Sequence, residues 1–109
     1  MNVFTQRPRE LAPGVTLTPL GRAAGAQAVR LDFAPGGVLP GHEAGCRQLF
    51  AVVRGRGWVR GGEDGERVRL DAGQAVVFEA GEWHESGSPE WMTAIVLESD
   101  ALELPDPPA

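Results

Sequence analysis

The amino-acid sequence predicts an all-β protein. No segment of about twelve residues shows a sustained helical period. Fifteen glycines and nine prolines supply turns between short runs that are apolar or that alternate between apolar and polar side chains. Short runs at spacings of roughly 8 to 12 residues, bounded by turns, are typical of a β-sandwich or β-barrel.

The composition indicates a single globular domain. The chain has 109 residues, 42% of them apolar and 23% charged, which suits one hydrophobic core and not two. No apolar run approaches the roughly 18 residues that a membrane-spanning helix needs, and the first residues lack the apolar segment of a signal peptide. Cys46 is the only cysteine, so no internal disulfide can form. We therefore expect a cytoplasmic protein that has no contact with a membrane.

The charges exclude several classes of function. The net charge is −5, and the ten basic residues are all arginines scattered from Arg7 to Arg69. No basic patch with interleaved aromatic residues appears, so we expect no nucleic-acid partner. Because the chain lacks lysine, it cannot form a Schiff base or use a lysine as a base.

The first strands follow an N-terminal arm that we assign to residues 1–14, because it is polar and interrupted by prolines. Val15, Leu17 and Leu20 then indicate a short edge strand, where a proline is tolerated. Residues 28–33 alternate between apolar and polar side chains, which is the period of a half-buried strand.

The central stretch carries the strongest strand signal. After a glycine turn, residues 38–42 lead to His42. The run from Gln48 to Arg54 is apolar on both faces, so we expect both faces to be covered. Gly55 then predicts a turn into a further strand at residues 58–60.

The second half repeats short strands and turns. Residues 61–65 read GGEDG and predict a hairpin tip. We expect strands at residues 66–70, 74–78 and 92–98, with another beginning at His84 after a loop at 79–83. The tail, residues 99–109, is rich in prolines that cannot continue a sheet ladder. We expect the domain to span residues 15–98 and the tail to be mobile.

Two stretches of similar design each carry one of the two histidines. The first reads Gly36, five residues, His42, one residue, Ala44, three residues, Gln48, six residues and Gly55. The second reads Gly73, five residues, Glu79, one residue, Gly81, two residues, His84, three residues and Ser88. Two strand-and-turn units with one imidazole each suggest two halves of one site.

This spacing resembles the two motifs of the cupin superfamily over residues 28–96. The resemblance implies a single-domain jelly-roll β-barrel. The residue identities depart from the family pattern at four positions. Ala44 stands where a second histidine is usual, Gln48 where glutamate is usual, Glu79 where proline is usual, and Ser88 where asparagine is usual.

The departures bear on metal binding. In a typical cupin three histidines and one glutamate hold a divalent metal, so the resemblance implies a metal site that keeps only His42, His84 and, at the glutamate position, Gln48. The amide oxygen of glutamine is a weaker donor than a carboxylate. Iron, zinc, nickel and manganese are the candidate ions. The competing interpretation is that both histidines line a cavity and form hydrogen bonds without any metal.

Four other residues are candidates to complete a metal shell, although none has the expected spacing. Glu43 adjoins His42 and on a regular strand faces the opposite side. Glu79 and Glu85 require a turn that redirects them, and Cys46 suits zinc or copper better than iron.

Several apolar residues are candidates for the wall of a ligand pocket. Phe50 and Val52 share the face of Gln48 by alternation. Trp58 offers an aromatic surface of the kind that lines ligand sites. For each of them an ordinary core or interface position is an equal alternative. Trp83 adjoins His84 and should face away from the interior, at a rim or an interface.

The opposite face of the central strand suggests a partner subunit. Leu49, Ala51 and Val53 form an apolar outer face that needs a cover. In cupins the cover is commonly a second subunit, so we expect a homodimer, with Val3 and Phe4 of the arm packing across the interface.

Two functions from different classes follow from these residues. The first is a cupin that binds a small molecule, a divalent metal or both, with undetermined activity. The alternative is a metal-dependent isomerase, lyase or dioxygenase acting on a small polar metabolite, in which Glu79 or Glu85 moves protons. A role as a sensor domain is a third possibility, although no DNA-binding segment is attached.

Overall fold

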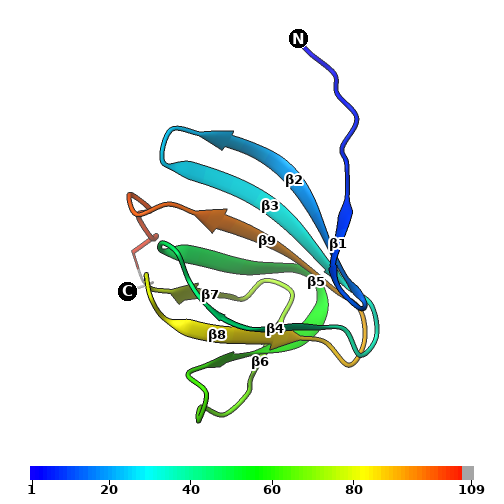
Figure 1. Ribbon diagram of the computed structural model, residues 1–109, viewed down its shortest axis with the longest axis vertical. Helices are drawn as coiled ribbons and strands as arrows, with labels where there is room; N and C mark the ends of the chain where they lie inside the picture. Colours follow the sequence, from blue (N-terminus) through cyan, green and yellow to red (C-terminus); the bar gives the residue numbers. More distant parts are fainter. Residues whose placement is uncertain (107–109) are drawn as a thin grey trace.

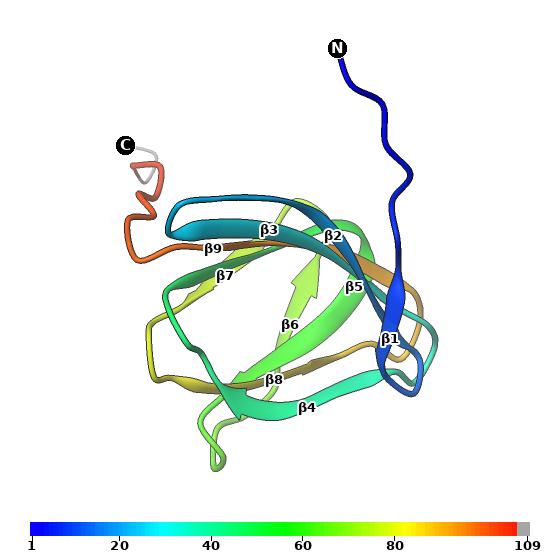
Figure 2. The same ribbon diagram turned by 45° about the horizontal axis from the view of Figure 1, so that its top comes forward.

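The computed structural model describes residues 1–106 and consists of nine β-strands that form a nearly closed barrel (Figures 1 and 2). The described residues contain no helix, so the all-β prediction is confirmed. The strands are β1 (Arg9–Ala12), β2 (Val15–Ala23), β3 (Ala26–Phe33), β4 (Val38–Glu43), β5 (Gln48–Gly61), β6 (Val68–Asp71), β7 (Ala75–Phe78), β8 (Trp83–Gly87) and β9 (Met92–Glu98).

All strand pairs are antiparallel. Along the sheet the order is β1-β2-β3-β9-β5-β8-β4, and β6 and β7 also pair with β5. Consecutive strands are therefore often not neighbours, as in a jelly roll. In Figure 2, β2, β3 and β9 form one wall of the barrel and β4 and β8 form the opposite wall, with β5 crossing between them.

Strand β5 is one continuous strand of 14 residues, although the sequence predicted a turn at Gly55. Its first part pairs with β7 and β9, and its second part pairs with β6 and β8. Gly55 has a φ of +72°, and any side chain there would collide with the Trp91 carbonyl oxygen. The glycine therefore bends the strand from one wall to the other and does not reverse the chain.

The N-terminal segment also differs from its prediction. Residues 9–12, which were assigned to the arm, form β1 and pair with the start of β2. A turn at Gly14, with a φ of +76°, joins the two strands, and Ala12 is buried. Only residues 1–8 precede the first strand, and they project away from the barrel (Figure 1).

Pro19 lies in the part of β2 that β1 does not reach, so no neighbouring strand needs its missing N–H on that side. The pairing of β2 with β3 is irregular between Pro19 and Gly21. The predicted edge position is therefore found only beyond Leu17, because β1 covers the first residues of β2.

The core lies between the two walls and contains three phenylalanines in a row. Phe33 and Phe50 meet edge to face with ring centroids 6.5 Å apart, and Phe50 and Phe78 meet in the same way at 6.5 Å. All three are buried. This row connects the core to the site described below.

The start of the C-terminal tail is anchored. The Ser99 amide donates to the Arg47 carbonyl at 3.0 Å, and the Arg47 guanidinium donates to the Leu102 carbonyl at 2.7 Å. The sequence predicted a mobile tail over residues 99–109. Of these, residues 107–109 lie outside the described residues. No helix in residues 1–106 has the length and apolar character to cross a membrane.

Candidate functional site

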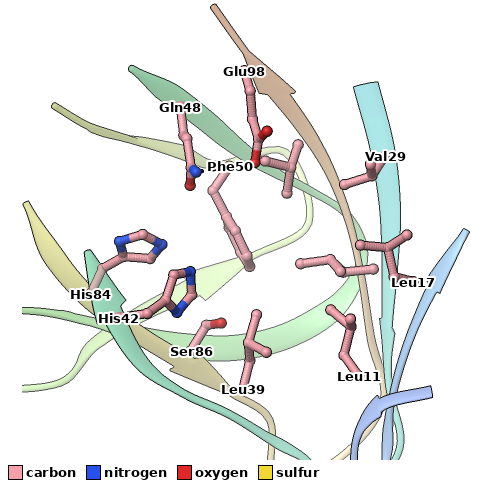
Figure 3. A pocket seen from close by; sticks show the side chains of 12 residues that line it. Leu11, Leu17, Val29, Leu39, His42, Gln48, Phe50, His84, Ser86 and Glu98 are labelled. Carbon is pink, nitrogen blue, oxygen red and sulfur yellow. Dashed lines mark hydrogen bonds between the residues drawn. The ribbon is translucent and has the colours of Figure 1, made fainter. Parts of the chain in front are cut away.

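The barrel interior contains a partly open pocket of about 320 Å³ (Figure 3). Residues from seven strands line it, so it depends on closure of the barrel. Its twelve lining residues are Leu11, Leu17, Val29, Leu31, Leu39, His42, Gln48, Phe50, His84, Ser86, Val96 and Glu98.

The two histidines lie side by side on the pocket wall. His42 of β4 and His84 of β8 are direct partners in the antiparallel pairing, so their side chains project from the same face of the sheet. Their ring centroids are 4.4 Å apart and the ring planes are inclined by 58°. The two sequence units therefore do contribute to one site.

The approach of β4 to His42 has a local cause in the sequence. The register shifts between Leu39 and His42, where Gly41 lies against the Trp83 indole so closely that any side chain would collide with the ring. The Arg60 guanidinium also lies over the Trp83 ring, 4.9 Å from its centroid. Trp83 is thus packed outside the pocket, on the side away from the imidazoles.

Both imidazoles are held by backbone carbonyl groups. Nδ1 of His42 lies 2.9 Å from the Pro40 oxygen, and Nδ1 of His84 lies 3.2 Å from the Glu82 oxygen. A carbonyl oxygen can only accept, so each Nδ1 carries the hydrogen and donates. In the neutral ring Nε2 then keeps its lone pair.

The lone pairs face the cavity. No fully buried side-chain nitrogen or oxygen in residues 1–106 lacks a hydrogen-bond partner. Nε2 of His84, which has no protein partner among the described residues, is therefore accessible from the pocket. Nε2 of His42 also has no protein partner there, and His42 is itself an exposed residue of the pocket lining. Metal-binding histidines in proteins show the same arrangement, with one ring nitrogen donating to the protein and the other free to bind.

Phe78 fixes the ring of His84. The two rings are stacked with centroids 4.2 Å apart and planes inclined by 14°. His84 is 5% exposed, and burial lowers the pKa of its imidazole, an effect to which the neighbouring His42 adds and which the hydrogen bond to Glu82 opposes. The neutral ring, which is the form that accepts a hydrogen bond or binds a metal, is therefore favoured.

Gln48 and Glu98 are two further polar side chains that line the pocket together with the histidines. Nε2 of Gln48 donates to Oε1 of Glu98 at 3.0 Å, and Nε2 of Gln27 donates to the other carboxylate oxygen. Because the amide nitrogen is committed to Glu98, the amide oxygen of Gln48 is left to face the imidazoles. Figure 3 shows this amide directed toward the part of the pocket that His42 and His84 line.

Glu98 was missed by the sequence analysis, although a signal for it exists. Along β9 the residues Met92, Ala94 and Val96 are buried, and Glu98 continues the same alternation at the end of the strand. A carboxylate in phase with three core residues belongs to the interior face. Leu11 was missed as well, because its strand was assigned to the arm.

The three residues predicted to line the pocket have different positions in the structure. Phe50 lines the pocket. Val52 has the same orientation but is packed into the core and does not line the pocket. Trp58 lies on the outside, where the Arg67 guanidinium is 3.7 Å from its ring centroid.

The position of Trp58 follows from the bend in β5. Gln48, Phe50 and Val52 are buried at even positions, whereas Gly57 and Val59 are buried at odd positions. The pairing with β9 shifts by one residue between Val52 and Arg54, and a shift of one residue exchanges the two faces of a strand. Simple alternation therefore cannot be extended from Phe50 to Trp58.

The carboxylates weighed as additional ligands lie elsewhere. Glu79 pairs with Arg47 at 2.7 Å, and Glu85, which alternates with His84, pairs with Arg60 at 3.1 Å on the outer face. Glu43 is exposed and does not line the pocket. These three residues are therefore not brought to the histidines.

Cys46 also lies outside the pocket. Burial raises the pKa of its thiol, and the charges of Glu98 and Asp100 add to this effect, so the thiolate that would bind a metal is disfavoured. Within residues 1–106 no three histidine, cysteine, aspartate or glutamate side chains are grouped closely enough to hold a metal ion. A metal held by three side chains at the two histidines would therefore need a donor of another type, such as the amide oxygen of Gln48.

Comparisons with known proteins agree with this architecture. The family model described as a cupin domain matches residues 29–98. An RmlC-like cupin from Shewanella frigidimarina has a TM-score of 0.78 at 24% identity, covering 90% of this chain and 86% of that chain. None of the curated proteins compared with the chain matches it.

Two further solved structures carry names that imply different activities. The polyketide cyclase RemF from Streptomyces resistomycificus has a TM-score of 0.79 at 17% identity, covering 92% of this chain and 80% of that one. A predicted oxalate decarboxylase from Thermotoga maritima has a TM-score of 0.74 at 18% identity, covering 87% and 91%. At these identities the likeness concerns the fold alone.

Proposed function

The chain belongs to the cupin domain family, and from this premise we propose that its barrel pocket binds a small molecule together with a divalent transition metal held by His42, His84 and Gln48. The observation that carries the proposal is the pair of adjacent imidazoles whose Nδ1 atoms are tied to backbone carbonyls. That arrangement leaves two Nε2 lone pairs directed at the same cavity.

The donor set fits a borderline divalent ion. Two imidazole nitrogens suit zinc, nickel or iron, and an amide oxygen extends the range to manganese. All three donors are neutral, so we expect weaker binding than in a cupin with a carboxylate ligand. Glu98 supplies a negative charge near the site through its hydrogen bond to Gln48. When bound, a divalent ion supplies a Lewis acid at the polar end of the pocket.

Elemental analysis of the purified, untagged protein tests the metal proposal. The protein is loaded with iron, zinc, nickel or manganese, dialysed, and compared with its His42→Ala and His84→Ala variants. Arg22→Ala, an exposed position away from the pocket, is the control. The expected result is one ion per chain in wild type and control, and a loss in both histidine variants. Equal metal content in all four proteins would refute the proposal.

A metal-dependent isomerase, lyase or dioxygenase is the alternative function. The observation that favours it is Glu98, the carboxylate that lines the pocket, because a proton carrier must lie within reach of a bound substrate. In this reading Glu98 takes the proton-transfer role first considered for Glu79 and Glu85. Oxygen uptake and substrate screening with metal-loaded protein test it, and Glu98→Gln should abolish any turnover found.

We also propose that a second copy of the chain covers the outer face of β5 and β9. Leu49 is paired with Leu97, and Ala51 with Ile95, so that apolar side chains are contiguous across the two strands. Val53 is 55% exposed, and such patches mark interaction surfaces. Light scattering after gel filtration should give a dimer mass for the wild type and a monomer mass for Leu97→Arg. A monomeric wild type would refute the proposal.

A further inference from the structure

The pocket has two chemically different ends, and they define a class of ligand. We propose that the pocket takes a compact molecule with an apolar body and one neutral hydroxyl head, such as a substituted phenol or alicyclic alcohol, and that it discriminates against carboxylates and sugars. The inference rests on the proposed function only in placing a small molecule in this pocket.

The apolar end determines the body of the ligand. Side chains from β1 to β4, together with two from β5 and β9, cover this part of the pocket without any polar atom (Figure 3). These residues are Leu11, Leu17, Val29, Leu31, Leu39, Phe50 and Val96. An apolar ring or branched chain gains free energy on leaving water for such a surface. A sugar would lose the hydration of its hydroxyl groups there without gaining partners.

The polar end determines the head of the ligand. Nε2 of His42 and Nε2 of His84 accept hydrogen bonds, because the hydrogen of each ring lies on Nδ1. One hydrogen of the Gln48 amide nitrogen is used by Glu98, and the amide oxygen has no protein partner within residues 1–106 and can accept. Glu98 itself only accepts when ionised. The end of the pocket therefore presents acceptors from four side chains, and Ser86 is the hydroxyl among the lining residues.

The charge of the pocket disfavours an anionic head. None of the ten arginines is among the lining residues, and the chain contains no lysine. The acidic residue in the lining is Glu98, and no cationic side chain within residues 1–106 forms a salt bridge with it. A ligand carboxylate would meet four acceptor side chains, one of which carries a like charge, whereas a hydroxyl donates to them.

The same head is compatible with the metal-free and the metal-loaded pocket. In the metal-free protein the hydroxyl donates its hydrogen to an imidazole. With a divalent ion present, the hydroxyl oxygen offers a lone pair. The volume of about 320 Å³ lies at the small end of the usual range of roughly 300–1,000 Å³ for ligand pockets, which restricts the body to about one ring with a small substituent.

Calorimetric titration of metal-free protein with three matched probes tests the inference. The probes are 4-isopropylphenol, 4-isopropylbenzoate and glucose, with EDTA present. The phenol is expected to bind at least about tenfold more tightly than the benzoate, and glucose is expected not to bind. Glu98→Gln should narrow the difference between phenol and benzoate, because it removes the like charge. Equal or tighter binding of the benzoate to the wild type would overturn the inference.

Methyl NMR of the wild-type protein locates the probe without relying on a variant. The phenol should shift the methyl signals of Leu17, Leu31 and Val29, while those of Val53 on the outer face serve as the control. A shift confined to Val53 would place the probe outside the pocket and overturn the inference. A metal titration of the same sample separates the two proposals. Phenol binding without metal uptake refutes the metal site alone, and metal uptake without phenol binding refutes the ligand class alone.

Discussion

Each of the two sequence units supplies one histidine to the site, yet the structure surrounds the two histidines differently. His84 is buried against the stacked ring of Phe78, whereas His42 is exposed and is held by one hydrogen bond to the Pro40 carbonyl. The cause is topological, because β8 lies between β5 and β4, while β4 is the last strand of the sheet. A side chain on an interior strand has neighbouring side chains from a strand on each side, whereas a side chain on an edge strand has them from one side only.

This difference suggests a division of roles within one site. The ring of His84 is ordered by the core before any ligand arrives, so little conformational entropy remains to be lost on binding. His42 closes the site from the edge and can adjust to what is bound. Binding should therefore depend on both residues, whereas folding should depend on His84 and its support.

The largest expected effect comes from removing that support. Phe78→Ala should lower the free energy of unfolding by about 3–5 kcal/mol, as truncation of a buried phenylalanine usually does. The substitution also removes the contact between Phe50 and Phe78 at the end of the row of aromatic rings. Urea denaturation measures the effect, with Phe4→Ala in the exposed arm as the control. A loss below about 1 kcal/mol would mean that the stacking does not order His84.

The next effect separates the two histidines directly. His84→Ala should lower the free energy of unfolding by about 2 kcal/mol or more, because it leaves a cavity beside Phe78. His42→Ala should change it by no more than about 0.5 kcal/mol, as at most exposed positions. Both values come from parallel urea titrations of metal-free protein. An equal loss of unfolding free energy in the two variants would mean that the two histidines contribute equally to folding.

Sequence patterns were sufficient to predict which residues come together at this site. The glycine and histidine spacing placed His42 and His84 in one site, and alternation along the central strand placed Gln48 and Phe50 on its inner face. Both are local properties, because a turn needs particular backbone angles and neighbouring residues of a strand face opposite sides. The metal set itself remains a prediction.

The limits of sequence reasoning lie where alternation is interrupted or continues beyond the obvious strand. The shift between Val52 and Arg54 exchanges the faces of β5, which puts Trp58 outside. Gly55 is the local signal for this irregularity, but the same glycine also predicts a turn, and the sequence alone does not separate the two. Val52 faces the interior as predicted but lies in the core and not at the pocket. Alternation predicts which face of the strand a residue occupies, but not its position along the barrel axis. Glu98 escaped notice because charged residues at strand ends are usually solvated.

Glu98 offers a smaller effect that extends the comparison to a further polar residue of the pocket. Glu98→Ala should weaken metal binding by about tenfold, the lower end of what loss of a supporting hydrogen bond costs. The substitution frees the amide of Gln48 to rotate and removes a nearby negative charge. Glu98→Gln removes the charge but keeps an acceptor for the amide, so its loss should be smaller. Isothermal titration with cobalt(II) measures both, and equal losses would mean that charge, not orientation, is what Glu98 contributes.

The smallest expected effect is a pH dependence that belongs to His84. Its pKa is lowered from the ordinary value of 6.5 in the folded protein, with burial as the main cause, so the unfolded chain takes up the proton first. The stability contributed by the neutral ring is therefore complete above about pH 6.5 and is lost as the pH falls through the folded pKa. Urea midpoints measured from pH 7.5 to 5.5 should decline in the wild type and in His42→Ala. The decline should be reduced in His84→Gln, which retains a polar side chain but has no proton to gain. If the urea midpoint of His84→Gln declines with pH as steeply as that of the wild type, the decline arises from other groups. Protonation of His84 would then make no contribution to the loss of stability.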